Sequence, residues 1–215
     1  MQKDEFAVHE LMRGECHRFL AACFYLPKKE LFAAENLLAN LTLSLQDICP
    51  DAAPFSRKME ENFARYSEEE LAVEYARLFV GPFGLKAPPY GSVYLDGERT
   101  VMGPSTMGTI SFYEKEGLAR DESFSELPDH IAVELEFMYF LIYKEVEALK
   151  MGDLELAKEY FNKQDDFRSR FLGKWVPKFC GEIKEGTENG FYSALADCVT
   201  AFVQAPALAQ GDSVS

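Results

Sequence analysis

The segment at residues 128–152 constrains the fold most, because it has the pattern of a helix that is apolar around more than one face. One stripe at helical spacing consists of Ile131, Leu135, Met138, Ile142, Val146 and Leu149. Four more apolar residues widen this stripe, namely Val133, Phe137, Phe140 and Leu141. A helix with such a wide apolar surface must be surrounded by other elements. The sequence therefore predicts that Pro128 begins the buried central helix of the fold.

Helical periodicity continues through most of the chain. Ser67 and Glu70 form a capping box, Ser105 or Thr106 caps another predicted helix, and Asp153 begins a further one. Residues 92–95 are the one short piece that could be extended, and no partner strand is evident. The predicted helices outside the central one cover residues 6–25, 30–48, 54–66, 67–80, 105–117, 153–173, 175 onward and 189–203.

These patterns predict an all-α fold, with a single helical domain of roughly nine helices over residues 1–205. Residues 206–215 are expected to form a flexible tail. The polar segment at residues 121–127 is a candidate hinge between two lobes, so the sequence leaves both a monomer and a domain-swapped dimer open.

A long loop rich in proline and glycine follows residue 80 and interrupts this helical pattern. Proline lowers the entropy of the unfolded chain, so such a loop can be both long and stiff. Its aromatic residues are Phe79, Phe83, Tyr90 and Tyr94. A stiff aromatic loop in a helical protein favours a binding surface, for example for a peptide. Packing of the same aromatic side chains within the loop is the alternative, and the pattern favours neither strongly.

The charge balance points to the kind of partner. The chain has 36 acidic and 22 basic residues and a formal net charge of −14. This balance argues against a nucleic-acid partner and favours a cationic ligand, although acidity can also serve solubility alone. The five cysteines form no CxxC pair, and the N-terminus lacks the apolar stretch of a signal peptide. We therefore expect a cytoplasmic protein without stable membrane insertion, since the longest uncharged apolar run, residues 137–143, is too short to span a bilayer.

Asp129, His130 and Glu134 are the best candidates for a polar site. His130 and Glu134 are four residues apart and share a helix face, and Asp129 lies at the helix N-terminus, where a carboxylate is favoured. In the structural alternative, Asp129 only caps the helix and His130 fills a pocket at the core edge. The chain has no HExxH, GxSxG, phosphate-loop or GxGxxG motif, so we predict no metal, no cofactor and no catalytic residue.

Five blocks of sequence carry a resemblance to a known family. They are EYARLFVGP at residues 74–82, PPYGSVYLDGE at 88–98, MGPST at 102–106, LPDHIAVELEFM at 127–138 and WVPKF at 175–179. In this order and spacing they resemble the TorD/DmsD family of cytoplasmic redox-enzyme maturation chaperones. The first sixty residues match that family only as amphipathic helices.

The resemblance implies an all-helical chaperone that binds the twin-arginine leader, and often the folded body, of the catalytic subunit of a molybdopterin oxidoreductase. Such chaperones delay export until the cofactor is loaded. Positions that the resemblance ties to leader binding are Leu78, Phe79, Pro89, Tyr90, Ser92, Tyr94, Gly103, Asp129 and His130. Some relatives have tryptophan in place of Tyr90 or Tyr94, which makes the aromatic anchor of this chain smaller.

Carboxylates are expected to meet the arginines of such a leader, because arginine pairs with them in bidentate geometry. The candidates are Asp96, Glu98, Glu126, Asp129 and Glu134. One competing hypothesis is a small nucleotide-binding or nucleotide-hydrolysing protein that uses Asp129, His130 and Glu134. Another is a helical scaffold that binds only folded protein.

Overall fold

The computed structural model describes residues 3–81, 84–97, 99–119 and 126–206. Within these residues the regular structure is entirely helical, which confirms the predicted all-α fold. The elements are α1 (Lys3–Ala22), α2 (Lys29–Ala34), α3 (Leu37–Ile48), α4 (Ala53–Arg65), α5 (Glu68–Tyr75), the π-helical η1 (Ala76–Val80), α6 (Gly91–Leu95), α7 (Pro104–Lys115), α8 (Ile131–Met151), α9 (Leu154–Arg170), α10 (Leu172–Gly186) and α11 (Gly190–Gln204).

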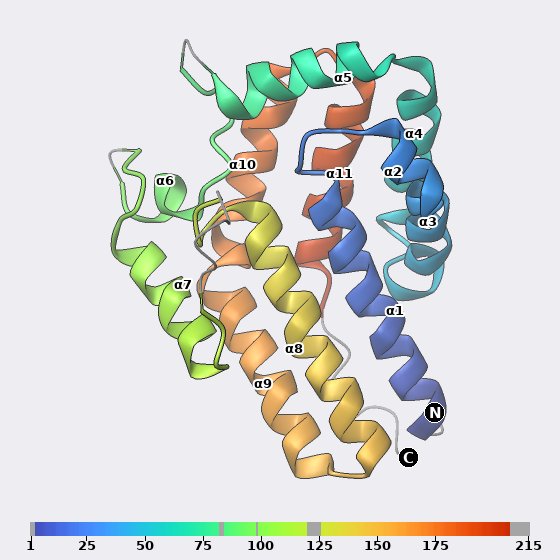
Figure 1. Ribbon diagram of the computed structural model, residues 1–215, viewed down its shortest axis with the longest axis vertical. Helices are drawn as coiled ribbons and strands as arrows, with labels where there is room; N and C mark the ends of the chain where they lie inside the picture. Colours follow the sequence, from blue (N-terminus) through green and yellow to red (C-terminus); the bar gives the residue numbers. More distant parts are fainter. Residues whose placement is uncertain (1–2, 82–83, 98, 120–125, 207–215) are drawn as a thin grey trace.

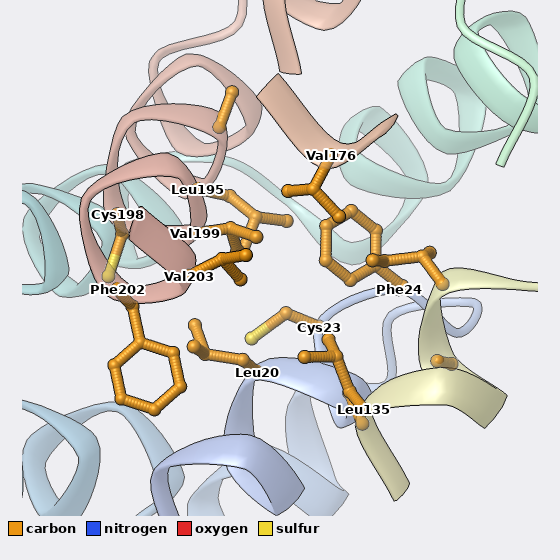
Figure 2. Close-up of a cluster of buried hydrophobic side chains, with 14 of the residues drawn as sticks. Leu20, Cys23, Phe24, Leu135, Val176, Leu195, Cys198, Val199, Phe202 and Val203 are labelled. Carbon is orange, nitrogen blue, oxygen red and sulfur yellow. The ribbon is translucent and has the colours of Figure 1, made fainter. Parts of the chain in front are cut away.

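Helix α8 packs between α1 and α9, while α11 packs against α4 and α10 (Figure 1). All six residues of the predicted apolar stripe are buried, so α8 is the central helix that the sequence predicted. Figure 2 shows how Leu20 of α1, Leu135 of α8, Val176 of α10 and Leu195 of α11 converge in the core. The main buried cluster thus joins helices from both halves of the chain.

The described residues form eleven α-helices where roughly nine were predicted. The segment at 30–48 is divided because Asn36 adopts a left-handed φ of 48° between α2 and α3. The expectation of an extended piece at 92–95 is wrong, because these residues belong to α6. By contrast, the capping box of Ser67 and Glu70 and the cap by Asp153 are confirmed.

Two helix starts differ from the predictions. Gly103, not Ser105 or Thr106, is the N-cap of α7, and Pro104 occupies the first turn. Helix α8 begins at Ile131, because the Nδ1 atom of His130 accepts a hydrogen bond from the backbone N–H of Ala132 and caps the helix. The expected start at Pro128 is therefore wrong, because the residues directly before Ile131 lie outside the helix.

Residues 121–125 of the candidate hinge and 207–215 of the expected tail lie outside the described residues. The hinge and the tail stay predictions. None of the helices in the described ranges is both long and apolar enough to cross a bilayer.

Candidate functional site

The proline-rich loop is attached to the start of α8 by a short antiparallel bridge between Tyr90 and His130. The N–H of Gly91 donates to the carbonyl of Asp129 at 2.8 Å, and the N–H of Ile131 donates to the carbonyl of Pro89 at 2.9 Å. Two segments forty residues apart in sequence are therefore fixed side by side. We call this junction, built from residues 89–94 and 129–134, the seam.

Asp129 holds the seam together through its side chain. It is 1% exposed, and its Oδ2 accepts hydrogen bonds from the N–H of Ser92 at 2.8 Å and the hydroxyl of Thr106 at 3.0 Å. One carboxylate thus connects the start of α8 to both α6 and α7. The expected cap of its own helix is wrong for Asp129, because His130 provides that cap.

Glu134 lies beneath α6 and has no exposed surface. Its Oε2 accepts a hydrogen bond from the indole Nε1–H of Trp175 at 2.9 Å. Burial raises the pKa of Glu134 well above its usual range, the indole bond opposes this shift, and the nearby charge of Asp129 adds to it. Burial therefore favours the protonated, neutral form of the Glu134 carboxyl group. Gly91 makes this approach possible, since a Cβ at position 91 would lie 3.1 Å from Trp175 Nε1 and 3.3 Å from Glu134 Oε1.

Three buried oxygen atoms of the seam have no hydrogen-bond partner in the described part of the chain: Ser92 Oγ, Asp129 Oδ1 and Glu134 Oε1. Buried polar atoms are usually paired, so such atoms gather where a fold serves something besides its own stability. All three belong to residues that the sequence had singled out. Residues 3–81, 84–97, 99–119 and 126–206 contain no group of three histidine, cysteine or acidic residues placed to hold a metal ion.

Aromatic rings surround His130, which is 2% exposed. Its ring stacks on that of Tyr25 with centroids 6.4 Å apart and meets Tyr90 edge-on at 5.5 Å. Burial lowers the pKa of His130 to about 4, so its imidazole is neutral at physiological pH. Its Nε2 lies 3.8 Å from Oε2 of Glu126. Tyr25, three residues after the end of α1, was not predicted, because the first sixty residues offered no motif beyond an amphipathic pattern.

Tyr94 occupies the α10 side of the seam. Its ring stacks on Trp175 with centroids 5.6 Å apart, and its hydroxyl donates to Oε2 of Glu182 at 2.9 Å. The guanidinium of Arg99 also pairs with Glu182, at 2.8 Å. Both tyrosines of the loop remain half-buried, so each presents part of its ring at the surface.

The other predicted residues lie deeper in the fold. Leu78 and Phe79 are buried in the core, where Phe79 packs on Phe24, Phe179 and Tyr192. Gly103 is buried at the start of α7. A Cβ at this position would overlap the carboxylate of Asp96, so the close approach requires glycine. Asp96 itself accepts hydrogen bonds from the N–H and hydroxyl of Ser105. Phe83 and Glu98 lie outside the described residues.

The structure also contains an acidic surface hollow away from the seam, which we call the α5 hollow. It is lined by Tyr66, Glu69, Glu70, Val73, Glu74, Glu188 and Asn189. No residue of this hollow was among the predicted site residues, and it shows no unpartnered buried atom.

Comparison with known proteins places these features in context. The family described as nitrate reductase delta subunit matches residues 37–181, a range that includes both segments of the seam. The chaperone protein TorD of Vibrio parahaemolyticus is 34% identical over 134 residues, covering 62% of this chain and 60% of that protein. The Tat proofreading chaperone DmsD of Salmonella typhi is 32% identical over 196 residues, covering 91% of this chain and 85% of that protein.

The matches to the TorD proteins of Vibrio parahaemolyticus and Photobacterium profundum thus span about 60% of the length of those relatives. Among solved structures, a protein of Archaeoglobus fulgidus that is assigned as a redox enzyme maturation protein has a TM-score of 0.52. It is 25% identical to this chain, and the match covers 86% of this chain and 91% of that one.

Proposed function

Since this chain belongs to the TorD/DmsD family of redox-enzyme maturation chaperones, we propose that it binds the twin-arginine leader and the body of a molybdopterin oxidoreductase subunit. In this role it assists cofactor loading and delays export until maturation is complete. It acts in the cytoplasm and has no catalytic step of its own. The seam is the place where the leader binds.

The observation that carries this proposal is the bridge between Tyr90 and His130. It brings together, at one place, most of the residues that the resemblance ties to leader binding. The half-buried rings of Tyr90 and Tyr94 supply aromatic contact surface for the apolar part of a leader. The net charge of −14 suits its cationic part. Leu78, Phe79 and Gly103 act indirectly, since they are buried and support the shape of the loop.

The alternative of nucleotide hydrolysis has less support from the geometry. A general base must reach the substrate or its attacking water. Glu134 is fully buried, burial raises its pKa and favours the neutral form, and its Oε2 is engaged by Trp175. Asp129 is likewise buried, with Oδ2 engaged by Ser92 and Thr106. The three residues proposed for that chemistry therefore serve the internal structure of the seam.

The test begins with a pull-down from the native cytoplasm, which identifies the client and its N-terminal sequence. Calorimetric titration then measures binding of that leader as a synthetic peptide, with a twin-lysine version as the comparison. We expect heat of binding and a raised melting temperature with the twin-arginine peptide. A protein that captures the folded subunit but gives neither signal with the peptide is a scaffold, and leader binding is then wrong.

A further inference from the structure

Two carboxylates flank Tyr25 at the edge of the seam. On one side, the Tyr25 hydroxyl donates to Oε1 of Glu136 at 3.0 Å. On the other side, the Tyr25 ring stacks on His130, whose Nε2 lies 3.8 Å from Oε2 of Glu126. We call Glu126, Tyr25 and Glu136 the Tyr25 strip. Tyr90 borders it through its edge-on contact with His130.

Glu126 lies within electrostatic reach of three tyrosines. Burial raises the pKa of Tyr75 to about 12, and the charge of Glu126 adds to this effect. The same two causes raise the pKa of Tyr90, burial being the larger. Burial also raises the pKa of Tyr25, with contributions from both Glu136 and Glu126. The Glu126 carboxylate thus acts on these tyrosines electrostatically, and its side chain remains 28% exposed.

Neither carboxylate of the strip forms an ion pair with a lysine or arginine in the part of the chain that the structure describes. A carboxylate beside the seam does, since Glu182 pairs with Arg99. Among the described residues, the basic side chain in contact with Glu126 is His130, which is neutral because burial lowers its pKa to about 4. The strip therefore offers two carboxylates that no lysine or arginine among the described residues compensates.

A carboxylate beside tyrosine rings suits a guanidinium group. Arginine can donate two parallel hydrogen bonds to one carboxylate, and its planar group is attracted to aromatic faces. An ammonium group is a compact, strongly hydrated charge and gains less from a flat aromatic surface. The number of carboxylates, two, also matches a pair of adjacent arginines.

We propose that the Tyr25 strip is the subsite for the two arginines of the leader, with Glu126 receiving one guanidinium and Glu136 the other. This inference rests on the proposed leader binding and assigns its cationic end. Tyr25 lies between the two positions, bonded to Glu136 directly and linked to Glu126 through the ring of His130. The apolar part of the leader then continues over Tyr90 towards Tyr94.

A double-mutant cycle tests the assignment. The proteins are wild type, Glu126→Gln and Glu136→Gln, and the peptides are the twin-arginine leader and two versions with one arginine replaced by glutamine. Each protein substitution should lower the affinity for the twin-arginine peptide by about tenfold, the size expected for losing one charge-assisted contact. Each should have less effect on the peptide that already lacks the matching arginine.

Glu69→Gln is the matched control, because it removes the same charge from the α5 hollow. It should leave the affinity unchanged within about twofold, and all variants should keep the wild-type melting temperature to within a few degrees. If the wild-type protein binds the leader while Glu126→Gln or Glu136→Gln binds it equally well, the assignment of the Tyr25 strip as the arginine subsite is wrong. The proposal that the protein binds the leader is not affected by this outcome. An equal loss with Glu69→Gln also overturns the strip, because the attraction is then not local. If wild type binds no peptide at all, the proposed function itself is wrong.

Discussion

Glu134 and Trp175 form a buried pair that can be followed directly, because Trp175 is the single tryptophan of the chain. The pKa of Glu134 is raised by folding, so its contribution to stability is fully present below the unfolded value of 4.5 and is lost as pH rises through the folded value. Glu134→Gln stays neutral and can still accept from the indole. The difference in melting temperature, Glu134→Gln minus wild type, should therefore increase as pH rises from 5 to 8.

The measurement is a melting curve and Trp175 fluorescence at each pH for both proteins. Glu134→Ala provides the contrast, since it leaves the buried indole N–H unpaired and should be about 1–3 kcal/mol less stable than Glu134→Gln at every pH. If wild type and Glu134→Gln keep a constant difference across this range, Glu134 does not change its protonation with folding.

Asp129 is the residue for which stability and binding can be separated. Asp129→Asn keeps one carbonyl oxygen to accept from Ser92 or Thr106, whereas Asp129→Ala leaves both donors unpaired in the interior. We expect Asp129→Ala to lose about 1–3 kcal/mol of stability and Asp129→Asn to lose less. Both substitutions should lower the affinity for the leader peptide, since each removes a contact that holds the seam together. Melting temperature and peptide affinity on the same samples check this, and wild-type affinity in both variants would make Asp129 purely structural.

Helix α6 depends on a glycine at its first residue. Gly91→Ala would place a methyl group against Trp175 Nε1 and Glu134 Oε1, and the hydrogen bond from Trp175 Nε1 to Glu134 Oε2 holds these two side chains in place. We expect a loss of about 1–3 kcal/mol, typical of overpacking. Gly181→Ala within α10 is the matched control, because a Cβ there meets nothing within 4 Å.

Gly181→Ala should raise stability by about 0.5–1 kcal/mol, since alanine loses less entropy than glycine in a helix. Denaturant unfolding of the two variants measures both changes. Equal effects of the two substitutions would show that the contact of α6 with the Glu134–Trp175 pair is loose.

At the scale of the whole molecule, the net charge of −14 should act on the encounter with a cationic leader. Exposed charges are screened over about 8 Å at physiological ionic strength, so the association rate should fall as salt is added. The dissociation rate should change less, because aromatic and apolar contacts hold the bound peptide. Stopped-flow mixing with a labelled leader at several salt concentrations measures both rates. An association rate that is indifferent to salt would limit the acidic surface to a role in solubility.

The sequence by itself determined the helices whose signals are local. The apolar stripe of α8 and the caps at Ser67 and Asp153 depend on neighbours three or four residues away, and all appear as predicted. It also brought out the residues that meet in the seam, through the resemblance and through the spacing of His130 and Glu134. The order of the five blocks was enough for the family, because such blocks depend only on which residues occur and at what spacing.

Tertiary structure alone decided how those residues are used. Residues 92–95 form part of a helix because the Asp129 carboxylate, 37 residues away, accepts from the N–H of Ser92. The pKa of Glu134 is raised because packing removes the carboxyl group from water, an effect that no local sequence pattern contains. Tyr25, which follows α1, reaches Glu136 of α8 because α1 packs against α8. Hydrogen bonds and desolvation between distant segments depend on the finished fold, and they set the chemistry of the seam.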